Sequence, residues 1–370
     1  MTSSVPARVR GLVKSAVAQA LSWSRADALI GLLATAGDGP VVIGYHRVVD
    51  DFRAAAGVAI PAMLTSRQML EAQLDWIGRR FRFVSLDDLG RELSEGAPAG
   101  RPAAAVTFDD GYRDVYEQAF PILERKGIPA GVFIVTDLVG TGQAQVHDRL
   151  FLLARRAFSR WPDPARELGR LLAALEIQLT GIERLARVAE DPLSAVVTLL
   201  RTLSRADVER VAEAIEADVG GDIAPPAPRG FEPLTWDMLA EMARAGVTVG
   251  SHTRTHAWLT LASPDEVSEE LGGSRAEIER RIGVKADHFA YPDGRFDTAT
   301  VEAVARAGYR FGYTTCTHRD ARSPLLTIPR RMLWEHACVD AVNRFSPAIL
   351  SCNLHGVWSL VSGCGQEHTS

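Results

Sequence analysis

The chain has 370 residues, a length that allows two average domains or one large α/β barrel with additions. Hydrophobic residues make up 46% and charged residues 24%, which is ordinary for a globular protein with a full core. A net charge of −5 argues against a general nucleic-acid binder. The four cysteines include no C-x-x-C pair, which argues against a zinc ribbon and against the disulfide framework of a small secreted domain.

The N-terminal segment, residues 1–38, is predicted to form an amphipathic helix. Its apolar residues recur at helical spacing, and basic residues outnumber acidic ones. We favour a helix packed on the protein's own body, because most amphipathic helices cover a core, and keep peripheral membrane contact as the alternative. The apolar stretch 28–36 is too short to span a bilayer, and the interrupted pattern of 8–24 argues against a signal peptide. We therefore expect the cytoplasm or the cytoplasmic face of a membrane.

Strand-like and helix-like segments then alternate in two blocks, residues 39–142 and 229–337. The strands are expected at 41–46, 81–84, 103–108, 130–135, 247–250, 288–291, 309–314 and 325–331. The helices are expected at 66–80, 86–93, 113–126, 235–245, 263–283 and 297–307. Repeated strand–helix units predict a largely parallel sheet, and seven or eight units favour a barrel.

Two regions interrupt or follow this alternation. Residues 143–228 are almost entirely helix-like and end in a proline-rich linker at 225–228, so we expect a helical insertion. Residues 338–370 are expected to form a mostly helical C-terminal segment.

Two adjacent carboxylates, Asp109 and Asp110, directly follow the predicted strand 103–108. Gly111 then allows the backbone to turn sharply. Because side chains alternate along a strand, one acid could bind a cation while the other handles a proton. The alternative is an ordinary Asp-Asp-Gly turn in solvent.

Two histidines, His252 and His256, follow the predicted strand 247–250 and are four residues apart. On a helical turn they would point the same way, and imidazoles so placed suit Zn²⁺ or another divalent metal. A surface or core pair without a metal is the alternative. His147 and His288 have no such pattern and are interpreted as structural or surface residues.

The positions of these residues favour a shared site. Reactive groups in parallel α/β folds collect at the C-terminal ends of strands. The acid pair, the histidine pair, the turn 291–294 and His46 each end a predicted strand. One Asp and two His would leave a coordination position open for water or substrate, as in catalytic metal sites. A free carboxylate could then act as general base, and His46 could donate a proton to the leaving group.

Three segments together resemble the motifs of polysaccharide deacetylases, the NodB-homology group or carbohydrate esterase family 4. They are residues 107–111, 251–256 and 290–294, and the resemblance covers about residues 40–140 and 229–335. It implies an α/β fold, a distorted (β/α)7-type barrel. It also implies that Asp109 is the catalytic base, that the third motif lines the substrate groove, and that the metal, usually Zn²⁺, is held by Asp110, His252 and His256.

The sequence departs from the family pattern at two catalytic positions. Many members carry an Arg just before the Pro of the third motif, where it steadies the base, but Tyr291 stands there in this chain. Arg330 or Arg331 could supply that charge. The late Leu-x-His motif, which supplies the general acid in the family, has no clear strand-borne match, and the only late candidate is His355 in a helix-like segment. A permuted branch that includes poly-N-acetylglucosamine deacetylases takes this acid from an early strand, which residues 44–48 resemble, so we prefer His46.

We therefore expect metal-dependent removal of acetyl groups from an N-acetylated amino sugar in a glycan. Trp258 could stack on a sugar ring, and the expected substrate contacts are Tyr291, Pro292, Gly294, Trp258 and Arg330. Two alternatives remain, a hydrolase of a non-sugar amide or ester and a glycan-binding module with a decayed site. The identity of the glycan and the oligomeric state are open.

Overall fold

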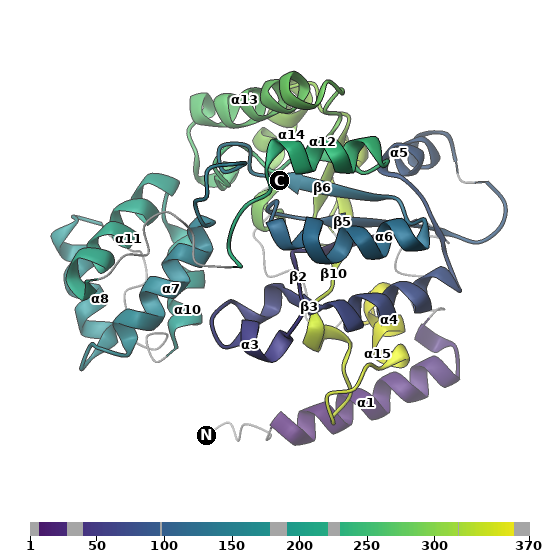
Figure 1. The fold of residues 1–370 in the computed structure, drawn as a ribbon, viewed down its shortest axis with the longest axis horizontal. Coiled ribbons are helices and arrows are strands. Elements are labelled where there is room, and N and C mark those ends of the chain that lie inside the picture. The colour runs from purple at the N-terminus through teal and green to yellow at the C-terminus, as the bar shows by residue number, and fades with distance from the viewer. Residues whose placement is uncertain are drawn as a thin grey trace.

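The computed structural model describes residues 7–27, 40–96, 98–177, 191–220, 230–316 and 318–358. In these ranges the strands are β1 (Val41–Tyr45), β2 (Arg47–Val49), β3 (Leu64–Ser66), β4 (Arg82–Phe83), β5 (Ala103–Phe108), β6 (Ala130–Ile134), β7 (Thr248–Ser251), β8 (His288–Ala290), β9 (Phe311–Thr314) and β10 (Ile328–Met332) (Figure 1). The helices of the barrel and the two ends are α1 (Ala7–Trp23), α3 (Phe52–Ala56), α4 (Arg67–Gly78), α5 (Leu86–Glu95), α6 (Phe120–Lys126), α12 (Trp236–Arg244), α13 (Pro264–Ile282), α14 (Thr298–Arg306) and α15 (Pro347–Leu354).

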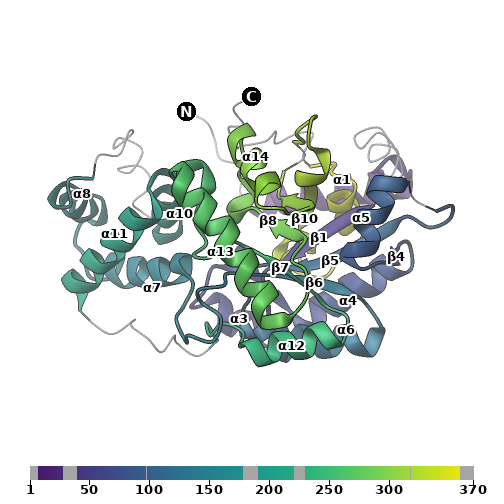
Figure 2. The same ribbon diagram turned by 90° about the horizontal axis from the view of Figure 1, so that it is seen from above.

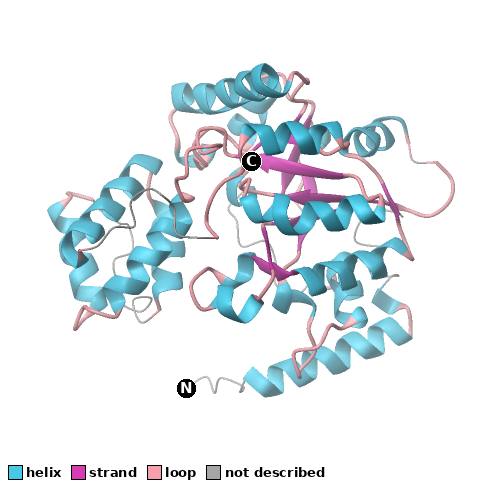
Figure 3. Cartoon of the chain, in the orientation of Figure 1, coloured by secondary structure: helices cyan, strands magenta, loops and turns pink. Residues whose placement is uncertain are grey.

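Seven parallel strands close into a barrel whose helices lie outside it (Figures 2 and 3). The order β1-β10-β9-β8-β7-β6-β5 is closed by pairing between β5 and β1. The short strand β4 adds to the first residues of β5, whereas β6 pairs with its last three residues. The α/β class and the (β/α)7-type barrel expected from the sequence are therefore confirmed.

Strand β5 sets the direction of both candidate acids. All six of its residues are buried, and their side chains alternate between two hydrophobic clusters. Ala104, Val106 and Phe108 pack with residues of α4 and α6, whereas Ala103 and Ala105 pack with Phe133 and Tyr313. Asp109 directly follows this strand and Asp110 lies in the turn after it, where the two side chains have different neighbours.

The insertion forms a helical unit beside the barrel, on the left in Figure 1. Its described helices are α7 (Val146–Phe158), α8 (Pro164–Ala174), α10 (Pro192–Thr202) and α11 (Arg205–Val219). They enclose a hydrophobic core of their own, which includes Leu150, Val196 and Val211. The linker expected at 225–228 lies outside the described residues.

Helix α1 packs against α15 through the fully buried Ala18, which contacts a cluster containing Ile349 and Cys352. On the opposite side of α1, Leu12 is 60% and Val13 56% exposed. From residue 338 to residue 358 the chain contains α15 and a short antiparallel bridge between Val339 and Phe345. None of the described helices combines the length and the apolar character needed to cross a bilayer.

The helical stretch expected at 113–126 is divided next to Pro121, a residue whose ring predicts a break or a new helix start. A π-helical turn, Val115–Ala119, precedes α6, which begins at Phe120 with Pro121 in its first turn. Proline is tolerated there because the first amide groups of a helix have no intrahelical acceptor. By contrast, α13 runs uninterrupted through Gly272 and Gly273.

Candidate metal and catalytic site

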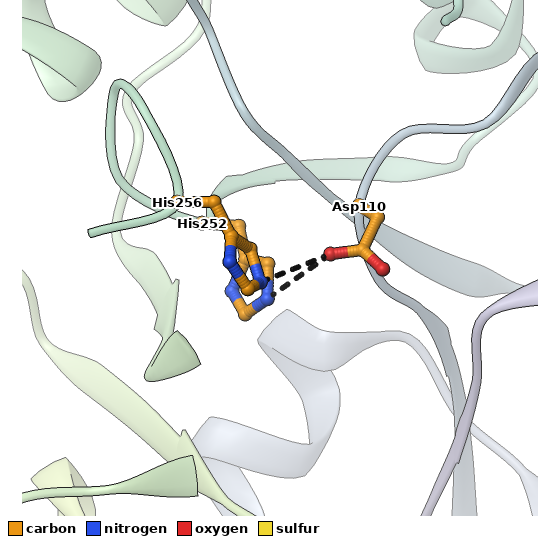
Figure 4. Close-up of side chains that lie close together, drawn as sticks. All are labelled: Asp110, His252 and His256. Atoms are coloured by element: carbon orange, nitrogen blue, oxygen red, sulfur yellow. Dashed lines mark ion pairs between the residues drawn. The ribbon is translucent and has the colours of Figure 1, made fainter. Parts of the chain in front are cut away.

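Asp110, His252 and His256 converge at the C-terminal ends of β5 and β7 (Figure 4). The Oδ1 atom of Asp110 lies 3.5 Å from Nε2 of His252 and 3.3 Å from Nε2 of His256. One ligand atom from each residue lies within 4.8 Å of the other two. The structure thus brings together the three residues proposed as metal ligands.

The convergence depends on unusual backbone geometry. Asp110 and His256 both have positive φ angles, of 69° and 63°. The two histidines lie in a loop after β7, so the idea that a helical turn aligns their side chains is wrong. Glu270 of α13 holds this loop, because its carboxylate accepts hydrogen bonds from the backbone amides of Arg254 and Thr255 at 2.7 and 3.0 Å. Sequence reasoning missed this acid, which lies far along a predicted helix.

The donor set fits a divalent cation. Oδ1 of Asp110 is buried and has no hydrogen-bond partner among the described residues, which is costly unless a cation satisfies it. Nδ1 of His252 lies 2.8 Å from the carbonyl oxygen of Ala290. Donation to that carbonyl leaves the lone pair on Nε2, facing Asp110. Zinc ligands about 2.0–2.1 Å from a tetrahedral centre lie about 3.3 Å apart, close to the observed separations.

The electrostatics of the three residues agree with this assignment. Burial alone would raise the pKa of the Asp110 carboxyl, but contacts with His256 and His147 hold it well below its usual range. Burial lowers the pKa of His252 to about 4. The carboxylate is therefore ionised and this imidazole neutral near pH 7, the protonation states that bind a metal.

Asp109 forms a separate, fully buried ion pair with Arg330 of β10. Nη1 and Nη2 of the guanidinium donate to the two carboxylate oxygens at 2.6 and 2.7 Å. Nη1 also lies 3.3 Å from the Thr107 hydroxyl, and Nε donates to the carbonyl oxygen of Thr314. Two parallel hydrogen bonds fix the carboxylate in orientation as well as in charge.

This geometry changes the role expected for Arg330. The side chain is completely buried and does not line the cavity, so we no longer assign it to substrate binding. It instead occupies the position of the cation that steadies Asp109, one of the two possibilities raised by the sequence. Burial alone would raise the pKa of Asp109, but the Arg330 guanidinium and His252 outweigh burial and lower it.

His147 also reaches the site, from the first turn of α7. Its Nε2 is 3.7 Å from Oδ2 of Asp110, and its ring centroid is 5.2 Å from that of His256. The Tyr112 hydroxyl donates to Asp148 at 2.5 Å and lies 2.8 Å from Nε2 of His147. Since that hydroxyl has one proton, His147 donates to its oxygen. The interpretation of His147 as a structural or surface residue was therefore incomplete, because no local pattern shows that the insertion returns to the barrel mouth.

The two candidate general acids occupy different places. His46 ends β1 and lines the same cavity as Asp109 and the three proposed ligands. His355 caps the C-terminal end of α15, where Nδ1 lies 3.9 Å from the Asp27 carboxylate, and it does not line that cavity. The arrangement supports the preference for His46.

The third motif forms a tight turn after β8. Tyr291 and Asp293 line the cavity, whereas Pro292 and Gly294 are buried and shape the turn. Trp258 lines the cavity too, and the Arg295 guanidinium lies 4.9 Å from its ring centroid. Of the substrate contacts expected from the sequence, Tyr291 and Trp258 therefore line this cavity, but Tyr291 is only 1% exposed, whereas Trp258 is partly exposed.

Comparison with known proteins identifies the same motifs. The model of the family described as "Polysaccharide deacetylase" matches residues 96–152 and 192–312. The Bacillus subtilis (strain 168) protein YxkH, provisionally named a polysaccharide deacetylase, is 30% identical over 250 residues, which are 67% of this chain and 58% of YxkH. The poly-beta-1,6-N-acetyl-D-glucosamine N-deacetylase of Escherichia coli (strain K12) is 32% identical over 135 residues, 36% of this chain and 19% of that enzyme. The chain thus spans less than two thirds of either relative.

A solved structure shares the fold. The deacetylase PplD of Streptococcus pyogenes, determined in complex with acetate, matches 85% of this chain and 97% of its own with a TM-score of 0.53 at 19% identity. The family match, the YxkH alignment and the barrel with its three motifs agree. The chain belongs to the polysaccharide deacetylase family.

Proposed function

We propose that this protein removes acetyl groups from an N-acetylated amino sugar in a glycan or glycan precursor by metal-dependent hydrolysis. One observation carries the proposal: the Asp110–His252–His256 cluster lines the same cavity as Asp109, whose carboxylate is paired with the buried Arg330. The family and the named activity of the Escherichia coli relative support an N-acetylated sugar as the substrate.

The proposed cation is Zn²⁺, held by Asp110, His252 and His256. When bound, it would acidify a water molecule and polarise the amide carbonyl. The nitrogen and oxygen donors suit Zn²⁺, and the open side of the cluster faces the cavity.

The remaining steps fall to the protein's own residues. Asp109 accepts the proton of the attacking water, and Arg330 holds its carboxylate ionised and aimed. His46 donates a proton to the departing amine. The amide C–N bond breaks as the C–O bond to water forms, so the products are acetate and the free amino sugar. Tyr291 and Trp258 contact the sugar from the cavity wall.

Acetate release from oligomers of N-acetylglucosamine by zinc-loaded protein tests this proposal. We expect Asp109→Asn to lower kcat by at least about 10²-fold with full metal content, because it removes a general base and leaves the three ligands. His252→Ala should lose both metal and activity.

Two results would contradict the proposal. Normal turnover by Asp109→Asn would remove the base assignment. Hydrolysis of chromogenic esters or non-sugar amides, without acetate release from the oligomers, would show that the same site acts on another class of substrate.

A further inference from the structure

The cavity at the metal site extends well beyond it, between the barrel and the helical insertion. It has a volume of about 630 Å³ and is lined both by the proposed metal ligands and by residues of α10. Cavities of about 300–1,000 Å³ hold whole small molecules. An acetyl methyl group would fill only a small part of this space.

One face of α10 supplies an aliphatic wall. Leu193, Val197 and Leu200 follow one another at helical spacing, line the cavity and are only partly buried. Other apolar residues of the same helix, including Ala195 and Leu199, are buried in the core of the insertion. Leu193 and Leu200 border this core and are only partly buried by it, so the insertion covers the second apolar face of the helix incompletely.

The barrel side of the cavity is also apolar. Ile60 and Met63, in the segment before β3, are partly buried and line it. Leu261 lines it as well and is 39% exposed. Apolar side chains from both sides thus line one cavity, and a predominantly apolar lining is typical of a ligand pocket.

Charged residues on the outer wall are already paired within the protein. Arg205 bonds Glu209 at 2.6 Å and the carbonyl oxygen of Thr255 at 3.1 Å. Glu266 completes the capping box of α13, and Glu270 holds the loop after β7. Sugar hydroxyls need hydrogen-bond partners when they leave water, and these groups are committed elsewhere.

We propose that the substrate is an amino-sugar amide that carries an aliphatic chain, and that this chain occupies the cavity between α10 and the barrel. The inference rests on the proposed function, because the chain must adjoin the amide at the metal site. The chain could belong to the acyl group or to a lipid on the anomeric oxygen. In both cases water cleaves the C–N bond to a carboxylate and an amine.

Three substrates of one amino sugar test the inference: the methyl and octyl glycosides of N-acetylglucosamine, and the methyl glycoside of N-octanoylglucosamine. Release of the primary amine, measured below the micelle concentration, reports turnover of all three. A fully buried methylene contributes up to about fourfold in kcat/KM. We expect kcat/KM for one of the two substrates with an eight-carbon chain to exceed that for the methyl glycoside of N-acetylglucosamine by at least about tenfold. The substrate that shows this increase identifies whether the chain belongs to the acyl group or to the glycoside.

A matched pair of variants locates the chain. Val197→Asn places an amide on the aliphatic face of α10 and should lower the octyl-to-methyl ratio of kcat/KM by about tenfold. Val284→Asn makes the same change at a valine that is 45% exposed and lies outside the cavity, and it should keep the wild-type ratio. A Val197→Asn ratio equal to that of wild type would overturn the assignment.

The outcomes separate this inference from the function on which it rests. Amine release from N-acetylglucosamine oligomers, with equal kcat/KM for methyl and octyl substrates, would overturn the aliphatic chain and leave the deacetylase function standing. The absence of amine release from every substrate, including the oligomers, would overturn both.

Discussion

Asp109 and Asp110 are neighbours in the chain, yet their carboxylates contact different residues. Asp109 is neutralised by the buried Arg330, whereas Asp110 faces two imidazoles and keeps one oxygen without a hydrogen bond in the described residues. Asp109 directly follows β5, whereas Asp110 lies in the turn after it with a φ of 69°, so the two side chains meet different neighbours. Two chemically identical carboxylates can therefore serve as a base and as a ligand.

Substituting Arg330→Met should destabilise the protein by about 3–5 kcal/mol, because the Asp109 carboxylate would remain buried without a counter-charge. Urea unfolding measures this change. The double variant Asp109→Asn, Arg330→Met should recover part of the loss, since an amide needs no cation. Equal losses in the single and double variants would show that the ion pair is not the source.

His147→Asn should weaken metal binding by about tenfold or more. His147 contacts Asp110, a proposed metal ligand, and residues that contact a metal ligand without binding the metal themselves keep it correctly oriented. Competition with a chromogenic chelator measures the dissociation constant. His288→Asn is the matched control, since that imidazole is also buried but bonds Tyr313 and Asp87. Unchanged zinc affinity in His147→Asn would limit this residue to packing.

At the scale of elements, the turn after β8 depends on a residue without a side chain. Gly294 has a φ of +68°, and a Cβ there would lie 2.4 Å from the backbone nitrogen of Thr315. Both the conformation and the close approach require glycine. We expect Gly294→Ala to displace Tyr291 and Asp293 from the cavity wall and to lower kcat/KM for the oligomers by at least about tenfold.

A steady-state comparison checks this expectation, with metal content measured in parallel. Gly272→Ala is a suitable control, because it lies within α13 and a Cβ there meets no other atom within 4 Å. Wild-type kcat/KM in Gly294→Ala would show that the turn does not shape the site.

The sequence was sufficient to predict that Asp110, His252 and His256 converge, because each follows a strand whose end faces the same side of a parallel barrel. It was insufficient for Arg330 and His147, whose positions depend on contacts between distant elements. In the closed ring β10 and β5 are both neighbours of β1, and this arrangement brings Arg330 within reach of Asp109. His147 reaches Asp110 only because α7 packs against the barrel mouth, which helical periodicity in the insertion does not encode.

At the scale of the whole molecule, the neutral, buried His252 makes metal-free stability depend on pH. The unfolded chain protonates this imidazole near pH 6.5 and the folded protein near pH 4. Between these values the unfolded state binds the extra proton, so stability rises with pH and is lost as pH falls. Between pH 4 and pH 6.5 the free energy of unfolding of the wild type should rise by on the order of 3 kcal/mol relative to that of His252→Gln.

Urea unfolding in the presence of a chelator, at several pH values, measures this difference. The comparison with His252→Gln cancels the titration of groups that both proteins share. If the free energy of unfolding changed with pH in the same way in both proteins, His252 would not be held neutral in the folded state.

The late position of β10 in the chain also has a consequence for the order of folding. The three proposed metal ligands come from β5 and β7, which precede β10 in the chain, whereas Arg330 arrives with β10 itself. Until that strand docks, Asp109 has no counter-charge, and burying it is costly. The nascent chain thus contains the three proposed ligands and Asp109 before it contains Arg330. The ion pair that orients Asp109 therefore cannot form until β10 has docked.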